Sequence, residues 1–224
     1  MEILYEDSQL LVCVKEPGVP VQSARIGVRD MVSALKTYRK ESEGISGEPY
    51  LGVVHRLDQP VGGVLVFAKT KGAAGELSGQ IQKGRMRKEY LAVVCGSAQK
   101  DGGRLEDMLL RDGRTNTSRV VGPRQAGAKR AVLDYHVLER QEDFSLVSVL
   151  LSTGRHHQIR VQMAHAGMPL AGDRKYWPEG DWKSGEGLAL WAYRLTFAHP
   201  KTGKALTFQA EPRGFFFEKF HLEG

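Results

Sequence analysis

One carboxylate, Asp58, stands beside an arginine in a turn between two apolar runs. Val53 and Val54 end the first run, and Val-Leu-Val-Phe at 64–67 forms the second. Apolar runs of this kind predict buried strands, and Gln-Pro-Val-Gly-Gly at 59–63 predicts the turn between them. A loop held by two strands fixes the aim of a reactive side chain and leaves it open to substrate. Asp58 is therefore a candidate catalytic carboxylate, although an aspartate before Pro and Gly is also ordinary turn chemistry.

A second candidate, Arg160, lies in a segment that the sequence pattern predicts to be one short helix. Residues 151–167 begin with helix-entry residues, carry apolar residues at helical spacing and end at a glycine. In such a helix Arg160 lies one turn after His156 and beside the apolar face. Its guanidinium is then placed either to reach a buried carboxylate or to point into water, and the spacing leaves both interpretations open.

These two segments resemble motifs of one family, the RluA-type pseudouridine synthases. The aspartate motif of that family, His-Arg-Leu-Asp before a strand ending in Ala-Lys, matches residues 55–58 and 68–69. The arginine motif, Gly-Arg-x-His-Gln-Ile-Arg, matches residues 154–160. The other similar segments are the Lys-x-Tyr strand at 88–96, Gly-Asp-Arg-Lys-Tyr at 172–176 and a closing strand, 188–200, that ends in Phe-x-His-Pro. Five signatures in the family order, over nearly the whole chain, are far more specific than one short motif.

The resemblance implies that the protein isomerises uridine in RNA to pseudouridine, without a cofactor or a metal. The bond between N1 and ribose C1′ breaks, the uracil turns, and C5 bonds to C1′. In the family the aspartate either attacks C1′ or removes the 2′ proton to give a glycal, and both routes stay open here. Either route needs an ionised Asp58 in a dry pocket, where desolvation raises a carboxyl pKa and an arginine partner opposes that rise.

The resemblance also assigns roles to the other candidate residues. Arg160 would pair with Asp58, and Tyr90 would pack its ring against the target base. Arg56 would occupy the space that the flipped base leaves and stack on neighbouring bases. Without the motifs, Tyr90 would be a strand-packing tyrosine and Arg56 a surface ion-pair partner. The expected substrate-binding residues are Arg56, His55, Arg155, Gln158, Leu188 and Leu190; the two leucines would form part of an aliphatic wall, or simply pack in the core.

Length and charge agree with this interpretation. The chain has 224 residues and a net charge of +6, and its pI is about 9.3. We expect a single catalytic domain over 1–224 that acts as a monomer on structured rRNA or tRNA. Basic clusters at 83–88 and 129–130 are expected to contact phosphates, although a solvated basic face is the alternative.

Other residue types favour a reduced, metal-free and cytoplasmic protein. Cys13 and Cys95 each lie in an apolar run and are expected to be reduced core residues. His156 and His157 are adjacent, and neighbours in a helix point about 100° apart, which disfavours a shared metal. The N-terminus has no signal-peptide pattern, and no apolar run approaches membrane length.

The remaining elements predict an α+β fold. Strands are expected at 3–5, 10–15 and 87–94, helices at 28–39 and 70–82, a polar loop at 41–49, and an antiparallel pair at 131–140 and 144–152. With the family resemblance, the fold is expected to be a mixed, mainly antiparallel β-sheet with flanking helices and a central catalytic cleft.

Three departures from the family pattern bear on substrate choice. The chain begins directly with catalytic-domain sequence, so we expect no small N-terminal RNA-binding domain. Val61-Gly62-Gly63 replaces the common Thr-Ser-Gly, and Trp191 stands where relatives often carry histidine.

Two other functions are alternatives to this one. One alternative is an RNA-binding or assembly protein that kept the fold and lost the reaction, and the intact Asp58, Tyr90 and Arg160 argue against it. A zinc deaminase would need His-x-Glu and Cys-x-x-Cys signatures, which this sequence lacks.

Overall fold

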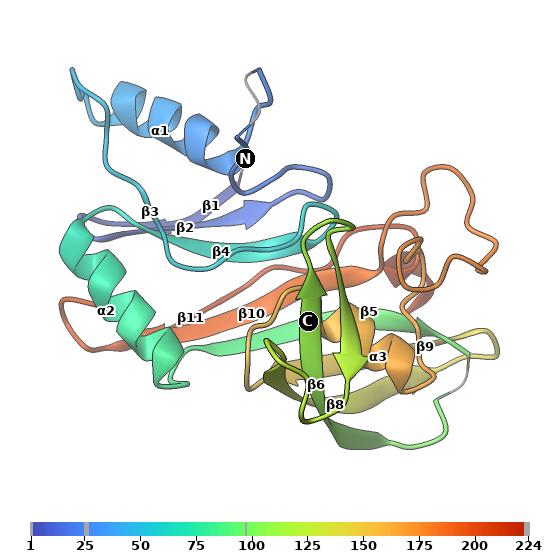
Figure 1. The fold of residues 1–224 in the computed structure, drawn as a ribbon. Helices are drawn as coiled ribbons and strands as arrows, with labels where there is room; N and C mark the ends of the chain where they lie inside the picture. Colours follow the sequence, from blue (N-terminus) through green and yellow to red (C-terminus); the bar gives the residue numbers. More distant parts are fainter. Residues whose placement is uncertain (1, 25–26, 97, 222–224) are drawn as a thin grey trace. The chain divides into compact units, whose positions relative to one another are not determined.

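The computed structural model (Figure 1) describes residues 2–24, 27–96 and 98–221. These residues form two compact units. Unit 1 contains the described residues within 1–87 and 192–211, and unit 2 contains those within 88–191 and 212–224. A single domain over 1–224 stays a prediction, and the two units are described in turn.

Two fully buried strands form the centre of unit 1. Every residue of β2 (Leu10–Lys15) and of β4 (Gly62–Ala68) is buried, and the two strands pair antiparallel, with Lys15 opposite Gly63. Such continuous apolar runs are typical of strands covered on both faces. The strand order is β1-β2-β4-β10, with β3 pairing β4 and β11 pairing β10. The bounds of the outer strands are β1 (Glu2–Glu6), β3 (Gly52–Val53), β10 (Leu190–Ala198, in unit 1 from residue 192) and β11 (Ala205–Gln209).

Two helices accompany this sheet, and both begin at a side-chain cap. α2 (Lys71–Gln82) begins after Thr70, whose hydroxyl accepts from the Ala73 amide, close to the predicted range. α1 (Met31–Ser42) begins three residues later than predicted, because Asp30 and Ser33 form a reciprocal capping box. The helix therefore also extends into the stretch predicted to be a polar loop.

Unit 2 is a curved antiparallel sheet with one short helix. Its strand order is β5-β9-β8-β6-β7, and the paired strands run antiparallel. The strands are β5 (Arg87–Cys95), β6 (Gly102–Asp112), β7 (Thr117–Val121), β8 (Lys129–Arg140) and β9 (Phe144–Leu151). The helix α3 (Gln158–His165) lies against β6 and β7, as Figure 1 shows, and a short 3₁₀ helix, η1 (Phe217–Lys219), follows near the C-terminus. The hairpin of β6 and β7 was not predicted.

The start of α3 corrects one prediction. His157 is the N-cap residue of this helix and has a left-handed backbone with φ of 53°. His156 therefore precedes the helix and does not lie one turn before Arg160 within it. The rings of His156 and His157 do not diverge but stack, with centroids 3.8 Å apart.

The predicted fold class is confirmed as an α+β structure with a mixed, mainly antiparallel sheet and three helices. The central catalytic cleft stays a prediction. Among the described residues, no helix is both long enough and apolar enough to cross a membrane.

Candidate active site

Asp58 lies in a short turn that leads into the central strand β4 of unit 1. Its carbonyl accepts a hydrogen bond from the Val61 amide at 3.0 Å, which closes the turn. The Asp58 side chain is half-buried, while Leu57 beside it is buried. β4 is buried along its whole length, so the turn is anchored to a strand that packing holds in place.

A buried lysine that the sequence interpretation missed holds the same turn. The Lys15 side chain is fully buried at the end of β2, and its ammonium donates to the carbonyls of Glu16, Val19 and Gln59 at 3.0, 2.7 and 2.9 Å. Burial lowers the pKa of Lys15 to about 8, and the charge of Asp58 acts in the opposite direction. Its position at the end of an apolar run, directly before Glu-Pro-Gly, was the available sequence signal.

The other two candidates of the aspartate motif differ in exposure. Arg56 is exposed, whereas the half-buried His55 accepts a hydrogen bond through Nε2 from the Val66 amide of β4 at 3.3 Å. His55 therefore ties the loop to the strand, and Arg56 is open to solvent. Their contacts with substrate stay predictions.

In unit 2, Tyr90 and the two candidate leucines belong to segments joined by main-chain hydrogen bonds. Tyr90 is buried in β5, where it pairs with Val149 of β9. Leu188 is half-buried and Leu190 is buried. The residue between them, Ala189, accepts from the Val93 amide of β5 at 3.1 Å. Tyr90 therefore lies on the strand to which the leucine segment is bonded.

Gln158 organises the loop that carries the start of the arginine motif. Its Oε1 accepts from the Thr153 hydroxyl at 2.8 Å and the Arg155 amide at 2.9 Å, and its Nε2 donates to the Val132 carbonyl at 3.1 Å. Gln158 is buried, while Arg155 is exposed and donates through Nε to the Arg130 carbonyl at 2.9 Å. The described contacts of Gln158 are thus contacts within the fold, and substrate contacts of both residues stay predictions.

Arg160 forms a buried ion pair with a carboxylate, one of the two arrangements that its spacing left open, but the sequence did not indicate that the partner is Asp173. Its Nε and Nη2 donate to the two carboxylate oxygens of Asp173 at 2.8 and 2.7 Å, and the two side chains are 6% and 0% exposed. Asp173 Oδ1 also accepts from the amides of Lys175 and Tyr176 at 3.0 and 3.2 Å. The Arg160 guanidinium lies over the Tyr176 ring, 5.1 Å from its centroid. This bidentate geometry fixes the plane of the guanidinium.

His157 lies in the same cluster and is held neutral. Its Nδ1 is 2.8 Å from the Tyr176 hydroxyl, which itself accepts from the Ser118 amide at 2.8 Å. Burial, together with the charges of the nearby Arg160 and His156, lowers the pKa of His157 to about 3. A charged imidazolium at this position would add a cation to an already basic cluster.

No group of three or more His, Cys, Asp or Glu side chains within 2–24, 27–96 and 98–221 is arranged to hold a metal ion. Cys13 and Cys95 are both free thiols. Burial raises the pKa of Cys13 to about 12 and that of Cys95 to about 11, so neither thiol is activated.

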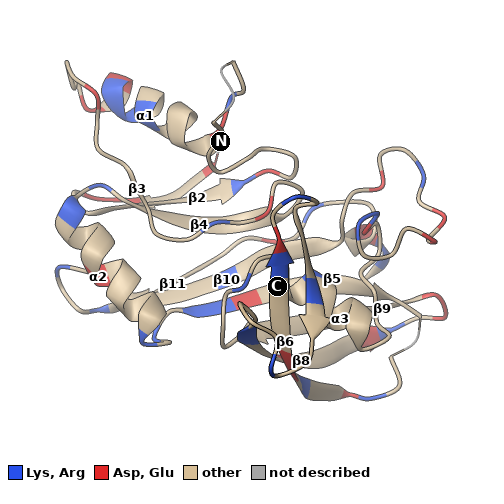
Figure 2. Ribbon diagram, viewed as in Figure 1, with Lys and Arg blue, Asp and Glu red and all other residues tan. Residues whose placement is uncertain are grey.

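Basic side chains are spread over both units, as Figure 2 shows. Within the two predicted basic clusters, two residues have particular surroundings. Lys88 lies beside the arginine-motif loop, with its Nζ 3.2 Å from a Cβ built on Gly154, and burial lowers the pKa of Lys88. Arg130 forms an exposed bidentate pair with Glu106, which offsets its charge. For the remaining members of the two clusters, contact with RNA phosphates stays a prediction.

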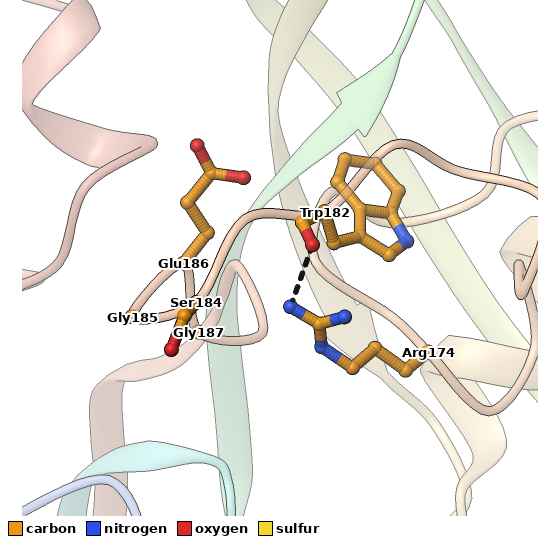
Figure 3. A pocket seen from close by; sticks show the side chains of 6 residues that line it. All are labelled: Arg174, Trp182, Ser184, Gly185, Glu186 and Gly187. Carbon is orange, nitrogen blue, oxygen red and sulfur yellow. Dashed lines mark hydrogen bonds between the residues drawn. The ribbon is translucent and has the colours of Figure 1, made fainter.

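A pocket in unit 2 lies next to the candidate residue Leu188 in the chain but is not lined by any predicted site residue. Figure 3 shows the Arg174 guanidinium reaching across the loop to the Trp182 carbonyl, a hydrogen bond of 2.9 Å. The same Nη2 also donates to the Lys183 carbonyl at 2.7 Å. The pocket has a volume of about 510 Å³ and is lined by Arg174, Trp182, Ser184, Gly185, Glu186 and Gly187. Arg174 therefore acts here as a brace for the loop.

The predicted site residues are divided between the two units. Unit 1 holds His55, Arg56 and Asp58, and unit 2 holds Tyr90, Arg155, Gln158, Arg160, Leu188 and Leu190. In unit 1 the candidates lie in the loop before β4, and in unit 2 they lie on β5, in loops, at the start of β10 and in α3. The pairing of Arg160 with Asp58 stays a prediction.

Residues 9–165 match the family model described as RNA pseudouridylate synthase. Over 211 residues the chain is 38% identical to a Bacillus subtilis (strain 168) protein named "Uncharacterized RNA pseudouridine synthase YlyB". This alignment covers 94% of this chain and 68% of that protein. Over 221 residues it is 37% identical to "Ribosomal large subunit pseudouridine synthase D" of Neisseria meningitidis serogroup A. This second alignment covers 94% of this chain and 58% of that protein. The chain thus spans well under two thirds of the length of this second relative.

A solved structure described as "Human RNA Pseudouridylate Synthase Domain Containing 4" has a similar fold. It superposes with a TM-score of 0.77 and 26% sequence identity, covering 97% of this chain and 90% of that one. A second, described as "Human RNA Pseudouridylate Synthase Domain Containing 1", gives a TM-score of 0.74 at 24% identity and supports the fold alone.

Proposed function

Because this chain belongs to the RNA pseudouridylate synthase family, whose named members are isomerases, we propose that it converts specific uridines of ribosomal or transfer RNA to pseudouridine. The observation that carries the proposal is the position of Asp58. It lies in a turn that leads into a fully buried strand, inside the range 9–165 that matches the family model, and its segment resembles the aspartate motif. This arrangement gives the carboxylate a fixed aim and an open side.

The proposed reaction begins when the target uridine is turned out of the RNA. Extrusion costs roughly a few kcal/mol, and least for an unpaired base. Exposed Arg56 is proposed to stack in the space left behind, while Tyr90 packs against the extruded uracil, with Leu188 and Leu190 forming an apolar wall. His55, Arg155 and Gln158 are proposed to shape the rim of the site.

Asp58 is proposed to act on the ribose. It either attacks C1′, displacing N1, or removes the 2′ proton to give a glycal and free uracil. In both routes the uracil turns and C5 bonds to C1′. In the first route this breaks the ester bond between Asp58 and C1′ and releases the carboxylate, and in the second the abstracted proton returns to C2′. The C5 proton is then lost and N1 is protonated, so the overall change is an isomerisation. Arg160 is proposed to help keep Asp58 ionised. Its bidentate bond to Asp173 fixes the plane of the guanidinium and also offsets part of its charge.

The proposed substrate class is RNA of the large ribosomal subunit. This choice is supported by the printed names of two relatives, which are large-subunit pseudouridine synthases D and C. Transfer RNA is the second candidate substrate. A catalytically silent RNA-binding protein remains the alternative function, and intact Asp58, Tyr90 and Arg160 argue against it.

The test is a map of pseudouridine in total RNA by carbodiimide-based sequencing. Cells lacking the gene would be compared with cells restored with wild-type protein, with Asp58→Asn or with Asp181→Asn, a control that removes an exposed carboxylate. We expect specific sites to disappear on deletion and to return with wild type and Asp181→Asn only. The position of those sites names the substrate RNA.

Binding separates the two functions. Asp58→Asn protein should bind the identified RNA within a few-fold of wild type, because the change removes no cation. A map that does not change on deletion, or that Asp58→Asn restores, would favour the RNA-binding alternative.

A further inference from the structure

His156 stands at the free position of the arginine motif, between Arg155 and His157. Both of its ring nitrogens contact the β6–β7 hairpin. Nδ1 lies 3.0 Å from the Ser118 hydroxyl, and Nε2 lies 3.1 Å from the side-chain oxygen of Asn116. The Ser118 hydroxyl is also 2.9 Å from the His156 carbonyl. A residue that the motif leaves free therefore connects the motif to a hairpin 38 to 40 residues earlier in the chain.

Tyr176 and Lys175 connect the same two segments. The Tyr176 hydroxyl accepts from the Ser118 amide at 2.8 Å and lies 2.8 Å from His157 Nδ1. Because His157 is neutral, its Nδ1 can accept the hydroxyl proton of Tyr176. Lys175 donates through Nζ to the Asn116 carbonyl at 3.1 Å. Together with the contacts of His156, these bonds form a joint between the hairpin and the arginine motif.

The contacts of His156 can form whether its ring is neutral or charged. In the neutral ring, Nε2 donates to Asn116 and Nδ1 accepts from the Ser118 hydroxyl. In the charged ring both nitrogens donate, and the hydroxyl donates to the His156 carbonyl instead. The joint is therefore not a pH switch, and it can be tested at a single pH.

The joint lies at the start of the helix that carries Arg160. α3 begins at His157 without a side-chain cap hydrogen bond, so its first turn depends on other contacts. Ser118, which bonds to the residue before this cap, is only 4% exposed. The Arg160 guanidinium lies over the ring of Tyr176, 5.1 Å from its centroid. The hairpin and Arg160 are thus held by the same few side chains.

Cations from three segments gather around this joint. Arg111 of the hairpin, Lys175 and Arg160 all lie near enough to His157 for their charges to lower its pKa. Arg111, Arg114 and Lys175 are exposed. A surface of this kind fits the phosphates of a nucleic acid.

We propose that His156 is a positioning residue for the reaction, which fastens the β6–β7 hairpin to the arginine motif so that RNA held by the hairpin meets Arg160 in a fixed position. This inference rests on the proposed function, since it takes RNA as the partner. A hairpin that is fixed before binding loses less conformational entropy when RNA binds. The joint should therefore affect the affinity for RNA more than the rate at saturating RNA.

The first test measures the joint in the protein without RNA. His156→Phe keeps an aromatic ring beside His157 but removes both nitrogens, and Ser118→Ala removes the hydroxyl on the other side of the contact. Thr117→Val is the control, because it removes a hydroxyl contact with Thr115, at 2.7 Å, that stays within the hairpin. Hydrogen exchange of the hairpin amides should be about tenfold faster in His156→Phe and Ser118→Ala, and within about twofold of wild type in the control.

The second test measures affinity and rate separately, with RNA from the deletion strain as substrate. His156→Phe should raise the RNA concentration at half saturation by about fivefold to tenfold, while the single-turnover rate at saturation stays within about twofold of wild type. Thr117→Val should change neither quantity. If His156→Phe does not fold, Ser118→Ala takes its place in both tests.

A double-mutant cycle then tests whether the joint acts through the hairpin. Arg111→Gln together with Arg114→Gln should weaken RNA binding less in the His156→Phe protein than in wild type, because a hairpin that is no longer fixed contributes less to binding. A merely structural role for His156 would give additive effects on affinity.

Additive effects would overturn the inference, as would hairpin exchange equal to that of wild type in the folded variants. A lower rate at saturating RNA with unchanged affinity would also overturn it. A wild-type protein that leaves uridine unmodified would instead contradict the proposed function. Because the exchange measurement needs neither RNA nor activity, the two failures are distinguishable.

Discussion

At the residue scale, the Arg160–Asp173 pair makes stability and site geometry depend on one buried carboxylate. Removing one partner of a buried ion pair leaves an uncompensated charge, which is costly. Asp173→Asn should lower the free energy of unfolding by about 3 kcal/mol, measured by urea denaturation.

Glu106→Gln is the matched control for that change. Glu106 and Arg130 form a bidentate pair of similar geometry in the same unit, but their side chains are 49% and 57% exposed. Exposed ion pairs contribute little to stability, so Glu106→Gln should leave the midpoint of urea denaturation close to that of wild type. If Asp173→Asn and Glu106→Gln lowered the free energy of unfolding equally, burial of the ion pair would not be the cause of the predicted loss.

His157 should make the protein less stable in acid. Its pKa is about 3 in the folded protein against an ordinary value of 6.5, so between these values the unfolded chain binds more protons. The stabilisation is fully present above pH 6.5 and is lost as the pH falls toward 3. Between pH 7 and pH 5, the free energy of unfolding of wild type should fall by about 2 kcal/mol more than that of His157→Asn. Asparagine tolerates the left-handed backbone at this position and does not titrate. Parallel losses in urea titrations of the two proteins would show that His157 is not the group responsible.

The sequence carried the candidate residues but not their partners. Asp58, Tyr90 and Arg160 stand in motifs that can be read directly, whereas the bond between Arg160 and Asp173 joins residues across a loop with no local signal. Lys15 was missed for a related reason. A lysine at the end of an apolar run is typical of a strand entering solvent, and its burial follows only from the loops that fold over it.

At the element scale, a close approach between two strands of unit 1 depends on glycine. A Cβ on Gly63 of β4 would lie 2.3 Å from the Ala192 carbonyl oxygen of β10, and the φ of Gly63 is +120°. Gly63→Ala should therefore be strongly destabilising, by about 2 kcal/mol or more, because both the contact and the backbone must change.

Gly75→Ala gives the opposite expectation and serves as the control. Gly75 lies within α2, and a Cβ there would meet no atom within 4 Å. Alanine favours the helix over glycine, so this change should stabilise the protein by about 1 kcal/mol. Thermal unfolding of both variants checks the pair, and a stable Gly63→Ala protein would mean that β10 can move away from β4.

Elements with strong patterns were predictable and those with mixed patterns were not. The continuous apolar runs of β2 and β4 identify buried strands from the sequence alone. The β6–β7 hairpin alternates charged and apolar residues irregularly, and Leu109 and Ser118 are its buried residues. Such a hairpin takes its strand conformation from pairing with β8, which a local pattern does not encode.

At the scale of the whole molecule, the net charge of +6 favours a polyanionic partner. Binding to RNA releases counterions, so affinity should fall steeply as salt is raised. Part of the positive charge is offset within the protein, as in the Arg130–Glu106 pair. Cations without an acidic partner are therefore better candidates for phosphate contacts than the basic clusters identified in the sequence.

The tip of the β6–β7 hairpin provides such cations. Arg111 and Arg114 are exposed, and neither forms an ion pair with a residue within the described parts of the chain. Changing both to glutamine should weaken RNA binding and reduce the slope of log affinity against log salt by up to about two, with the rate at saturating RNA unchanged. Arg140→Gln is the control, because Arg140 is already paired with Asp101 at 2.6 Å. Filter binding at several salt concentrations measures both slopes. An unchanged slope for the double variant would mean that RNA does not contact this hairpin. A reduced rate at saturating RNA would mean that the hairpin also affects the chemical step.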